Sequence, residues 1–259
     1  MYRNIQQIIL HKLTSTGEFV QFVRDCFYWM FRQPFRIQVF LKRLETIGVD
    51  SLSIIVLVGT FAGMVFGLQT GYAFRTFSAE SLVGSTVGIA VTRELAPVFT
   101  ALMIIARAGS SMAAQIGTMQ VTEQVLALQS MGVNPIQYLV APRVLASFIM
   151  VPLLTGVFDL VGILGSYVVG VHFLGIPEGP FLYRLKLYVD LDDIFQGLIK
   201  AAVFGVVLAL ISCFKGYQTE GGAEGVGKST TQAVVYSSVT VLVLDYFLSY
   251  WILEWFPQF

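Results

Sequence analysis

Five long apolar segments are the feature that most restricts the fold of this chain. A membrane-spanning helix needs about 20 mostly apolar residues. Five segments meet that requirement: 52–73, 83–106, 144–174, 194–214 and 232–253. Because the lipid interior offers the backbone no hydrogen-bond partner, each segment is expected to be a helix. The sequence therefore predicts an all-α polytopic membrane protein with five transmembrane helices.

The low charge content supports the same conclusion. Only 12% of the 259 residues are charged and 56% are hydrophobic. A soluble domain usually carries about 25% charged residues, so lipid must solvate much of this surface. The formal net charge of +0 gives no indication of a nucleic-acid partner. The two cysteines and two histidines are scattered without metal-ligand spacing, so we expect no metal site, no cofactor and no catalytic residue in this chain.

The distribution of lysine and arginine predicts the orientation. The region before the first span is basic, with Arg3, Lys12, Arg24, Arg32, Arg36, Lys42 and Arg43. The first loop carries only Arg75, and the tail after the last span carries neither residue type. The positive-inside rule then places the N-terminus in the cytoplasm and, after five spans, the C-terminus outside. Loops 107–143 and 215–231 become cytoplasmic, and loop 175–193 becomes external.

Residues 1–48 are expected to form a cytoplasmic or interfacial region, followed by a transmembrane domain at 49–259. An apolar stripe at helical spacing comprises Phe19, Phe22, Val23, Phe27 and Met30, and Pro34 follows it. A second stretch, 35–44, mixes aromatic and basic residues. This pattern suits an amphipathic helix in the cytoplasmic membrane interface. A helix packed on the protein's own surface is the alternative.

The first span carries glycines at every fourth position: Gly59, Gly63, Gly67 and Gly71. This spacing keeps them on one helix face, where small residues let another backbone approach closely in lipid. The partner is either a helix of the same chain, or a second subunit or substrate beside this face. The spacing fits both alternatives.

Ionisable residues also fall within the spans, namely Arg93, Glu94, Asp159, Lys200 and Asp245. Such groups are costly in a membrane and normally face a cavity, a pathway or each other. Neighbouring Arg93 and Glu94 point about 100° apart on a helix, so each needs another partner. Lys200 and Asp245 are the candidates, and Pro97 is expected to kink the helix nearby. We expect these charges to line a transport cavity, with buried structural pairs as the alternative.

A short amphipathic helix is predicted at 121–131 in the cytoplasmic loop, with Val121, Val125 and Leu128 on one face. Gly132 can end it in a left-handed conformation, and Pro135 prevents its continuation. The helix suits docking into a groove of another protein. A surface helix folded back on the bundle is the alternative.

Residues 222–229 match the phosphate-binding pattern GxxxxGK[ST] letter for letter. That motif functions between a strand and a helix of an α/β sheet, whereas here it lies between two membrane spans. We therefore interpret it as a glycine-rich turn that enters the last helix, with Ser229 or Thr230 as its cap.

Several ordered motifs closely resemble the MlaE family of ABC-transporter permeases. They are the segments 93–97, 106–117, 122–135, 141–143, 199–204, 216–217, 223–231 and 244–246. The resemblance covers most of the chain from about residue 48 onward. It implies an interfacial N-terminal helix, five spans and a cytoplasmic coupling helix between the second and third spans.

The resemblance also implies partners and a location. Such permeases are homodimers in the bacterial inner membrane, driven by cytoplasmic ATPase subunits that bind ATP and magnesium. They associate with periplasmic MCE-domain proteins and, in some systems, with a small cytoplasmic accessory subunit. They move phospholipids or related lipids between the inner membrane and the outer envelope. The chain itself would be non-catalytic.

By resemblance, the lipid cavity would include Leu68, Tyr72, Arg93, Glu94 and Leu95, to which the charge argument adds Lys200 and Asp245. The coupling helix would present Thr122, Glu123, Gln124, Leu128 and Met131 to the ATPase. Related permeases often carry arginine at the position of Lys228, which keeps the positive charge.

Two other functions fit the spans and their charges. A proton-coupled secondary carrier would use Glu94 or Asp245 as a relay and work without ATP. Such carriers usually contain an inverted repeat, and the five unequal spans show none. A non-transporting membrane scaffold would need the coupling helix but not the charges inside the spans.

Overall fold

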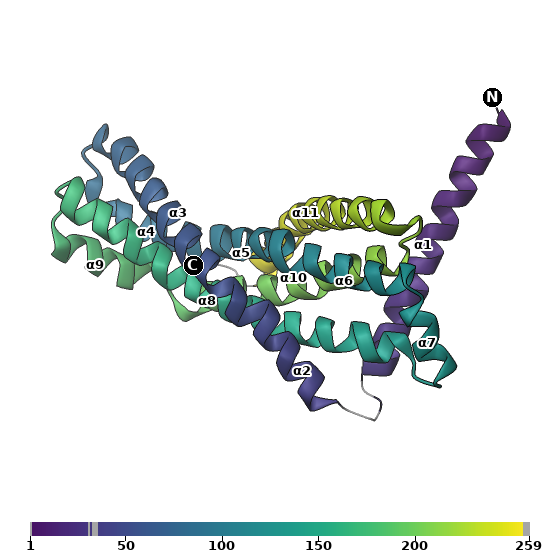
Figure 1. Cartoon of the computed structure of the whole chain (residues 1–259). Helices are drawn as coiled ribbons and strands as arrows, with labels where there is room; N and C mark the ends of the chain where they lie inside the picture. Colours follow the sequence, from purple (N-terminus) through teal and green to yellow (C-terminus); the bar gives the residue numbers. More distant parts are fainter. Residues whose placement is uncertain (1, 31, 33–35, 256–259) are drawn as a thin grey trace.

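The computed structural model describes residues 2–30, 32 and 36–255, with side chains from residue 14 onward except those of 15, 253 and 255. No strand occurs within these ranges (Figure 1). The helices are α1 (Tyr2–Met30), α2 (Ile37–Leu44), α3 (Asp50–Arg75), α4 (Val83–Ala90), α5 (Ala96–Ile104), α6 (Ser110–Val121), α7 (Gln124–Ser130), α8 (Ala141–Tyr167), α9 (Glu178–Tyr188), α10 (Leu191–Tyr217) and α11 (Gly222–Trp255). Pro34 and Phe35, which the sequence assigned to the N-terminal region, lie outside the described residues.

π-helical turns join several helices into longer ones. They occupy Glu45–Val49, Val91–Leu95, Ile105–Gly109, Ile136–Val140 and Val168–Phe173, and a 3-10 turn at Glu80–Leu82 precedes α4. Five continuous helices are long and apolar enough to span a membrane: Ile37–Arg75, Glu80–Val121, Ile136–Phe173, Leu191–Tyr217 and Gly222–Ile252. The five predicted spans are therefore confirmed.

The ends of the spans differ from the prediction. The second span continues to Val121, so the loop expected from residue 107 begins 15 residues later than predicted, at Thr122. α2 runs directly into the first span rather than forming a separate helix. The loop that was expected to be external contains the unpredicted helix α9, whose Phe181 is buried. The additional turns of the spans carry polar residues that lower the mean hydropathy. Hydropathy alone therefore makes the predicted spans too short.

The glycine-rich turn is also shorter than predicted. α11 begins at Gly222, directly after a turn in which Gly221 has a positive φ of 87°. The P-loop-like letters therefore form the first two turns of a helix. The predicted cap is wrong, because the Thr230 hydroxyl donates to the Val226 carbonyl inside that helix. No loop is present at these residues to surround a phosphate.

The glycine face of the first span packs against α8 of the same chain. A Cβ at Gly59 would lie 2.7 Å from Val161, and one at Gly67 would lie 3.0 Å from Ser166. A Cβ at Gly63 would overlap the backbone of Gly162. The described structure thus uses this face for packing within one chain, the first of the two alternatives.

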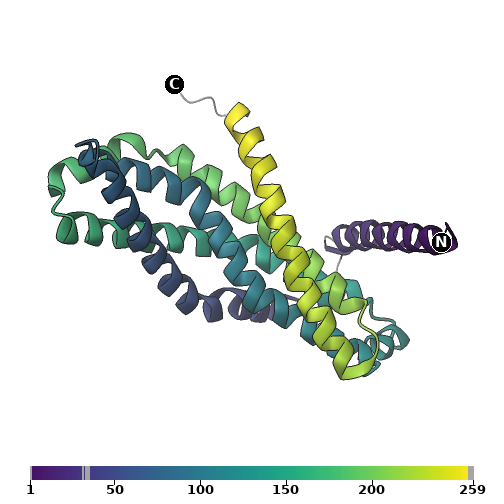
Figure 2. The ribbon, with the colours of Figure 1, turned by 90° about the horizontal axis from the view of Figure 1, so that it is seen from above.

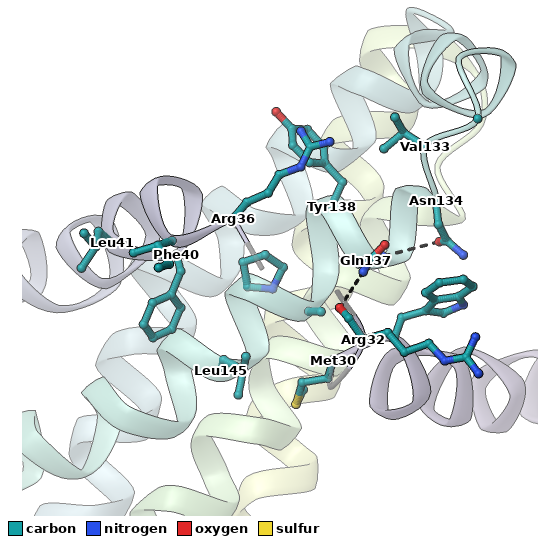
Figure 3. Close-up of a pocket in the computed structure, with 15 residues that line it drawn as sticks. Met30, Arg32, Arg36, Phe40, Leu41, Val133, Asn134, Gln137, Tyr138 and Leu145 are labelled. Carbon is teal, nitrogen blue, oxygen red and sulfur yellow. Dashed lines mark hydrogen bonds between the residues drawn. The ribbon is translucent and has the colours of Figure 1, made fainter. Parts of the chain in front are cut away.

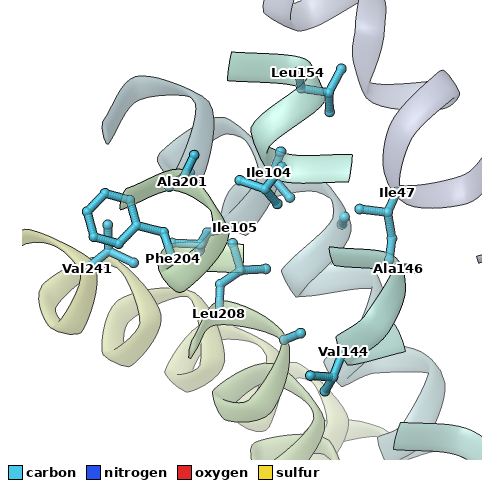
Figure 4. Packing of buried hydrophobic residues seen from close by; sticks show 14 of the residues in the cluster. Ile47, Ile104, Ile105, Val144, Ala146, Leu154, Ala201, Phe204, Leu208 and Val241 are labelled. Carbon is cyan, nitrogen blue, oxygen red and sulfur yellow. The ribbon is translucent and has the colours of Figure 1, made fainter. Parts of the chain in front are cut away.

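The apolar core lies between α5, α8, α10 and α11. Side chains from these helices meet in one cluster (Figure 4), including Ile104, Leu154, Phe204, Leu208 and Val241. α11 leans across the other spans when the molecule is seen from above (Figure 2). Only 17% of its most apolar stretch is buried, so most of the surface of that stretch is left for lipid or for a partner.

α1 crosses the end of the bundle at which α7 also lies (Figure 1). Phe22, Cys26 and Met30 are buried there, and the Phe22 ring lies 5.4 Å from that of Phe214. This face of α1 packs on the protein's own surface, as the alternative interpretation expected. Phe27 and Tyr28 stay exposed on another face, and their contact with lipid stays a prediction.

Cys26 is expected to react very slowly with thiol reagents. Burial raises the pKa of its thiol to about 12, so the reactive thiolate is scarce at neutral pH. In a Cys213→Ala background, maleimide labelling of Cys26 at pH 7 should be at least about 100-fold slower than labelling of a Phe27→Cys, Cys26→Ala control. Phe27 is the exposed neighbour. Equal rates would show that this part of α1 does not pack on the bundle.

Candidate functional site

Lys200 forms the centre of a charged cluster within the spans. Its Nζ donates to Glu94 Oε2 at 2.7 Å and to Ser249 Oγ at 2.7 Å, and it lies 3.4 Å from Asp245 Oδ1. The Lys200 side chain is only 2% exposed, whereas that of Glu94 is 47% exposed. The cluster joins the second, fourth and fifth spans, and it brings together three of the charges that the sequence singled out.

Two local features bring Lys200 to this position. Pro97 has no N–H to donate to the carbonyl of Arg93, four residues earlier in the helix. Lys200 Nζ donates to that carbonyl oxygen at 3.0 Å. One turn before Lys200, a side chain at Gly197 would overlap the Thr92 carbonyl, so glycine there permits the close approach of α10. The expected irregularity near Pro97 appears as the π-helical turn Val91–Leu95.

Arg93 has a different partner, which the sequence did not indicate. Its Nε donates to Asp193 Oδ1 at 2.8 Å, and the Asp193 side chain is buried. The other Asp193 oxygen accepts the backbone N–H of Asp190, forming a capping box at the start of α10. Arg93 therefore ties the second span to the beginning of the fourth. Only the repeated acidic residues before that span could have suggested this partner.

The remaining residues expected at the cavity lie in three different places. Leu68 and Tyr72 are exposed on α3, beside the glycine face, and they are not members of the charged cluster. Leu95 is half-buried against the core. Asp159, another charge within a span, is buried on α8, and neither of its carboxyl oxygens has a hydrogen-bond partner among the described residues. The cluster thus contains Glu94, Lys200 and Asp245 together with Ser249.

The loop helix α7 is shorter than the predicted 121–131, because Thr122 and Glu123 separate it from α6. Glu123 adopts a left-handed conformation with φ 59°, and Gly132 ends the helix with φ 73°. Val125 is buried and Leu128 is half-buried against the bundle, as part of the predicted apolar face.

The other side of α7 is exposed. Thr122, Glu123 and Gln124 are accessible, and Met131 is 68% exposed. One face of the helix therefore packs on the protein while polar and apolar side chains remain free on the other.

A cavity of about 460 Å³ lies where α1, α2 and the start of α8 approach one another (Figure 3). Phe40, Tyr138 and Leu145 contribute apolar surface, and the Arg36 guanidinium lies 4.6 Å from the centre of the Tyr138 ring. Gln137 Nε2 donates to the Arg32 carbonyl at 2.9 Å. Sequence reasoning did not identify this cavity, since its walls come from separate helices.

Comparison with known proteins identifies the family. The Permease MlaE family model matches residues 40–251, which is most of the chain. This chain belongs to the MlaE permease family. It is 40% identical over 235 residues to a probable ABC transporter permease protein of Rickettsia felis, covering 91% of each chain. It is also 41% identical over 210 residues to the intermembrane phospholipid transport system permease protein MlaE of Haemophilus influenzae, covering 81% of this chain and 80% of that protein.

Membership of the MlaE permease family agrees with the five apolar helices. The chain is a multi-pass membrane protein and the permease subunit of an ABC-type transporter. Among the side chains that the structure describes, no group of three or more His, Cys, Asp or Glu residues could hold a metal ion. In an MlaE-family permease, the charges within the spans and the exposed surface of α7 are the features to examine.

Proposed function

We propose that this permease subunit moves phospholipids between the inner membrane and the outer envelope of a bacterium. The observation that carries the proposal is the Lys200 cluster, which leaves the Glu94 carboxylate 47% exposed within a membrane span. Ionisable groups at such positions commonly mark a transport path. The name of the Haemophilus relative supports phospholipid as the substrate class.

The charge of the cluster suits a lipid headgroup. One cation, Lys200, faces the two carboxylates of Glu94 and Asp245, so the cluster carries one excess negative charge. The cationic part of a zwitterionic headgroup would be attracted to the exposed Glu94 carboxylate. Apolar surface for the acyl chains would come from Leu68 and Tyr72 on α3 and from Leu95, which follows Glu94 in the π-helical turn.

The proposed assembly contains several other chains. Exposed apolar residues along α11 offer a surface for a second copy of this chain, and a homodimer would enclose more of the path. ATP and magnesium would bind to cytoplasmic ATPase subunits, which α7 would contact. A periplasmic MCE-domain protein would receive or deliver the lipid, and a small cytoplasmic accessory subunit could complete the complex. The N-terminus would be cytoplasmic and the C-terminus periplasmic.

Lipid analysis of the native complex tests the proposal. The complex would be purified from native membrane, and its phospholipids compared with those carried by a detergent-matched, unrelated membrane protein. We expect enrichment of phospholipid in the wild type and its loss in Glu94→Gln. Lys186→Gln, on the exposed side of α9, is the matched control. Absence of enrichment, together with full transport by Glu94→Gln and Arg93→Met, would refute the lipid path.

The coupling helix gives a separate prediction. Glu123→Arg combined with Met131→Arg should reduce co-purification of the ATPase at least about tenfold. The first substitution reverses a charge at the proposed interface, and the second adds a positive charge there. Quantitative mass spectrometry of the purified complex measures this ratio. Glu224→Arg, which changes an exposed residue at the start of α11, is the control. Undiminished ATPase and continued transport in the double variant would contradict the assignment of α7.

ATP dependence separates this proposal from the other two functions. In proteoliposomes, a secondary carrier would transport with a pH gradient and without the ATPase. A scaffold would tolerate replacement of Glu94 and Asp245 while still requiring α7. We expect transport only with ATP and the complete complex, and loss of transport when either carboxylate is replaced.

A further inference from the structure

A small cavity is lined by three arginines from three different spans. Its volume is about 220 Å³, and Arg43, Arg107 and Arg143 surround it together with Gln115 and Ser111. Arg43 belongs to α2, Arg107 to the second span and Arg143 to the beginning of α8. None of these residues is part of the Lys200 cluster or of the surface assigned to the ATPase.

Each of the three helices contains a π-helical turn close to its arginine. The turns are Glu45–Val49, Ile105–Gly109 and Ile136–Val140. A π-helical turn inserts an extra residue and changes which side of the helix the following side chains occupy, and it is frequent at functional sites. Three such turns around one cavity indicate that regular helix geometry is interrupted where the arginines converge.

The cavity has more positive than negative charge. Arg107 lies 3.1 Å from Asp50 Oδ2, and Asp50 is half exposed. No carboxylate in the described part of the chain forms an ion pair with Arg43 or Arg143. Three guanidinium groups therefore face one carboxylate.

Arg143 is the most unusual of the three, because its side chain is only 1% exposed. It donates to the Leu139 carbonyl at 2.5 Å and to Gln115 Oε1 at 3.1 Å. Arg43 donates to the same Gln115 oxygen, also at 3.1 Å. The Nε–H of Arg143 has no hydrogen-bond partner among the described residues. A buried cation with a free donor and no counter-ion is unfavourable unless an anion completes the site.

We propose that this cavity binds a phosphate group through Arg43, Arg107 and Arg143. Guanidinium groups match phosphate oxygens in geometry and form charge-assisted hydrogen bonds with them. The cavity has room for a phosphate group but is small for a whole phospholipid. The phosphate could belong to a lipid headgroup at the membrane surface or to a free anion. The site does not depend on the transport path proposed above.

Thermal unfolding of the detergent-purified complex tests the site. Inorganic phosphate and dihexanoyl phosphatidic acid would be titrated separately, with chloride at matched ionic strength. We expect a saturable rise in Tm with at least one of the two probes and none with chloride. Arg43→Gln, at the partly exposed rim, should weaken apparent binding about tenfold, and Arg143→Gln should weaken it further. The control Lys228→Gln removes an exposed cation outside the cavity and should leave binding unchanged.

The two probes distinguish the sources of the phosphate. Stabilisation by inorganic phosphate indicates a free-anion site, whereas stabilisation by the short-chain lipid alone indicates a headgroup site. A lipid already bound would mask both effects, so phospholipid retained through purification would also be measured by mass spectrometry in wild type and Arg43→Gln. Lower retention in the variant supports a headgroup site. Equal retention, with no Tm response that depends on Arg43, would overturn the proposal.

Discussion

Replacing Gly63 with leucine should separate the first span from α8 and prevent the protein from folding stably. A side chain at Gly63 would overlap the Gly162 backbone, which cannot move aside as a flexible side chain could. Packing in lipid depends on such close approach of small residues. Overpacking usually costs about 1–3 kcal/mol, and a clash with backbone belongs at or above the upper end of that range.

Thermal unfolding of the purified protein and its yield in the membrane fraction measure this effect. We expect a large loss of both for Gly63→Leu and a smaller loss for Gly63→Ala. Gly156→Ala is the matched control, because a Cβ at this α8 position would meet no neighbouring atom within 4 Å. If Gly63→Leu unfolded at the wild-type temperature, α3 and α8 would not pack along the glycine face.

Lys200→Met should produce the second large effect, on both stability and transport. The substitution keeps most of the side-chain volume but leaves Glu94 and Asp245 without their shared cation. It also leaves the Arg93 carbonyl without the donor that Lys200 provides. Removing one partner of a buried ion pair costs about 3–5 kcal/mol of stability. We expect about 2–3 kcal/mol here, because the Glu94 side chain is 47% exposed.

The control and the rescue separate stability from transport. Lys215→Met removes a cation from the same helix, where the ammonium lies 4.8 Å from the Tyr236 ring centre and forms no ion pair among the described residues. It should have a small effect. Adding Glu94→Gln and Asp245→Asn to Lys200→Met should restore much of the stability, because no carboxylate is then left unpaired. Transport should stay absent, and its return would show that the charges serve only structure.

The sequence allowed the charged cluster to be predicted only in part. Lys200 and Asp245 could be named as partners for Glu94 because charges within apolar spans are few and must find one another. Asp193 could not be named as the partner of Arg93, since it lies at the end of a span, where a solvated acidic residue is ordinary. The contact of Lys200 with the Arg93 carbonyl follows from Pro97 only when α10 is known to pass beside it.

The arginine cavity illustrates the same limit. Arg43, Arg107 and Arg143 are separated in the sequence by 64 and 36 residues, and each alone resembles a basic residue near the end of a span. Hydropathy does not reveal π-helical turns, because inserting one residue changes the direction of side chains but not the average composition. Their convergence on one cavity is visible only in three dimensions.

The sequence alone determined that this protein is a five-span, all-helical membrane protein. Lipid offers the backbone no hydrogen-bond partner, so each long apolar segment is expected to form a helix. Tertiary structure decided which helix the glycines meet, how far each span extends and which charges pair. These properties depend on the rotation and approach of helices distant in sequence, which close packing and π-helical turns set.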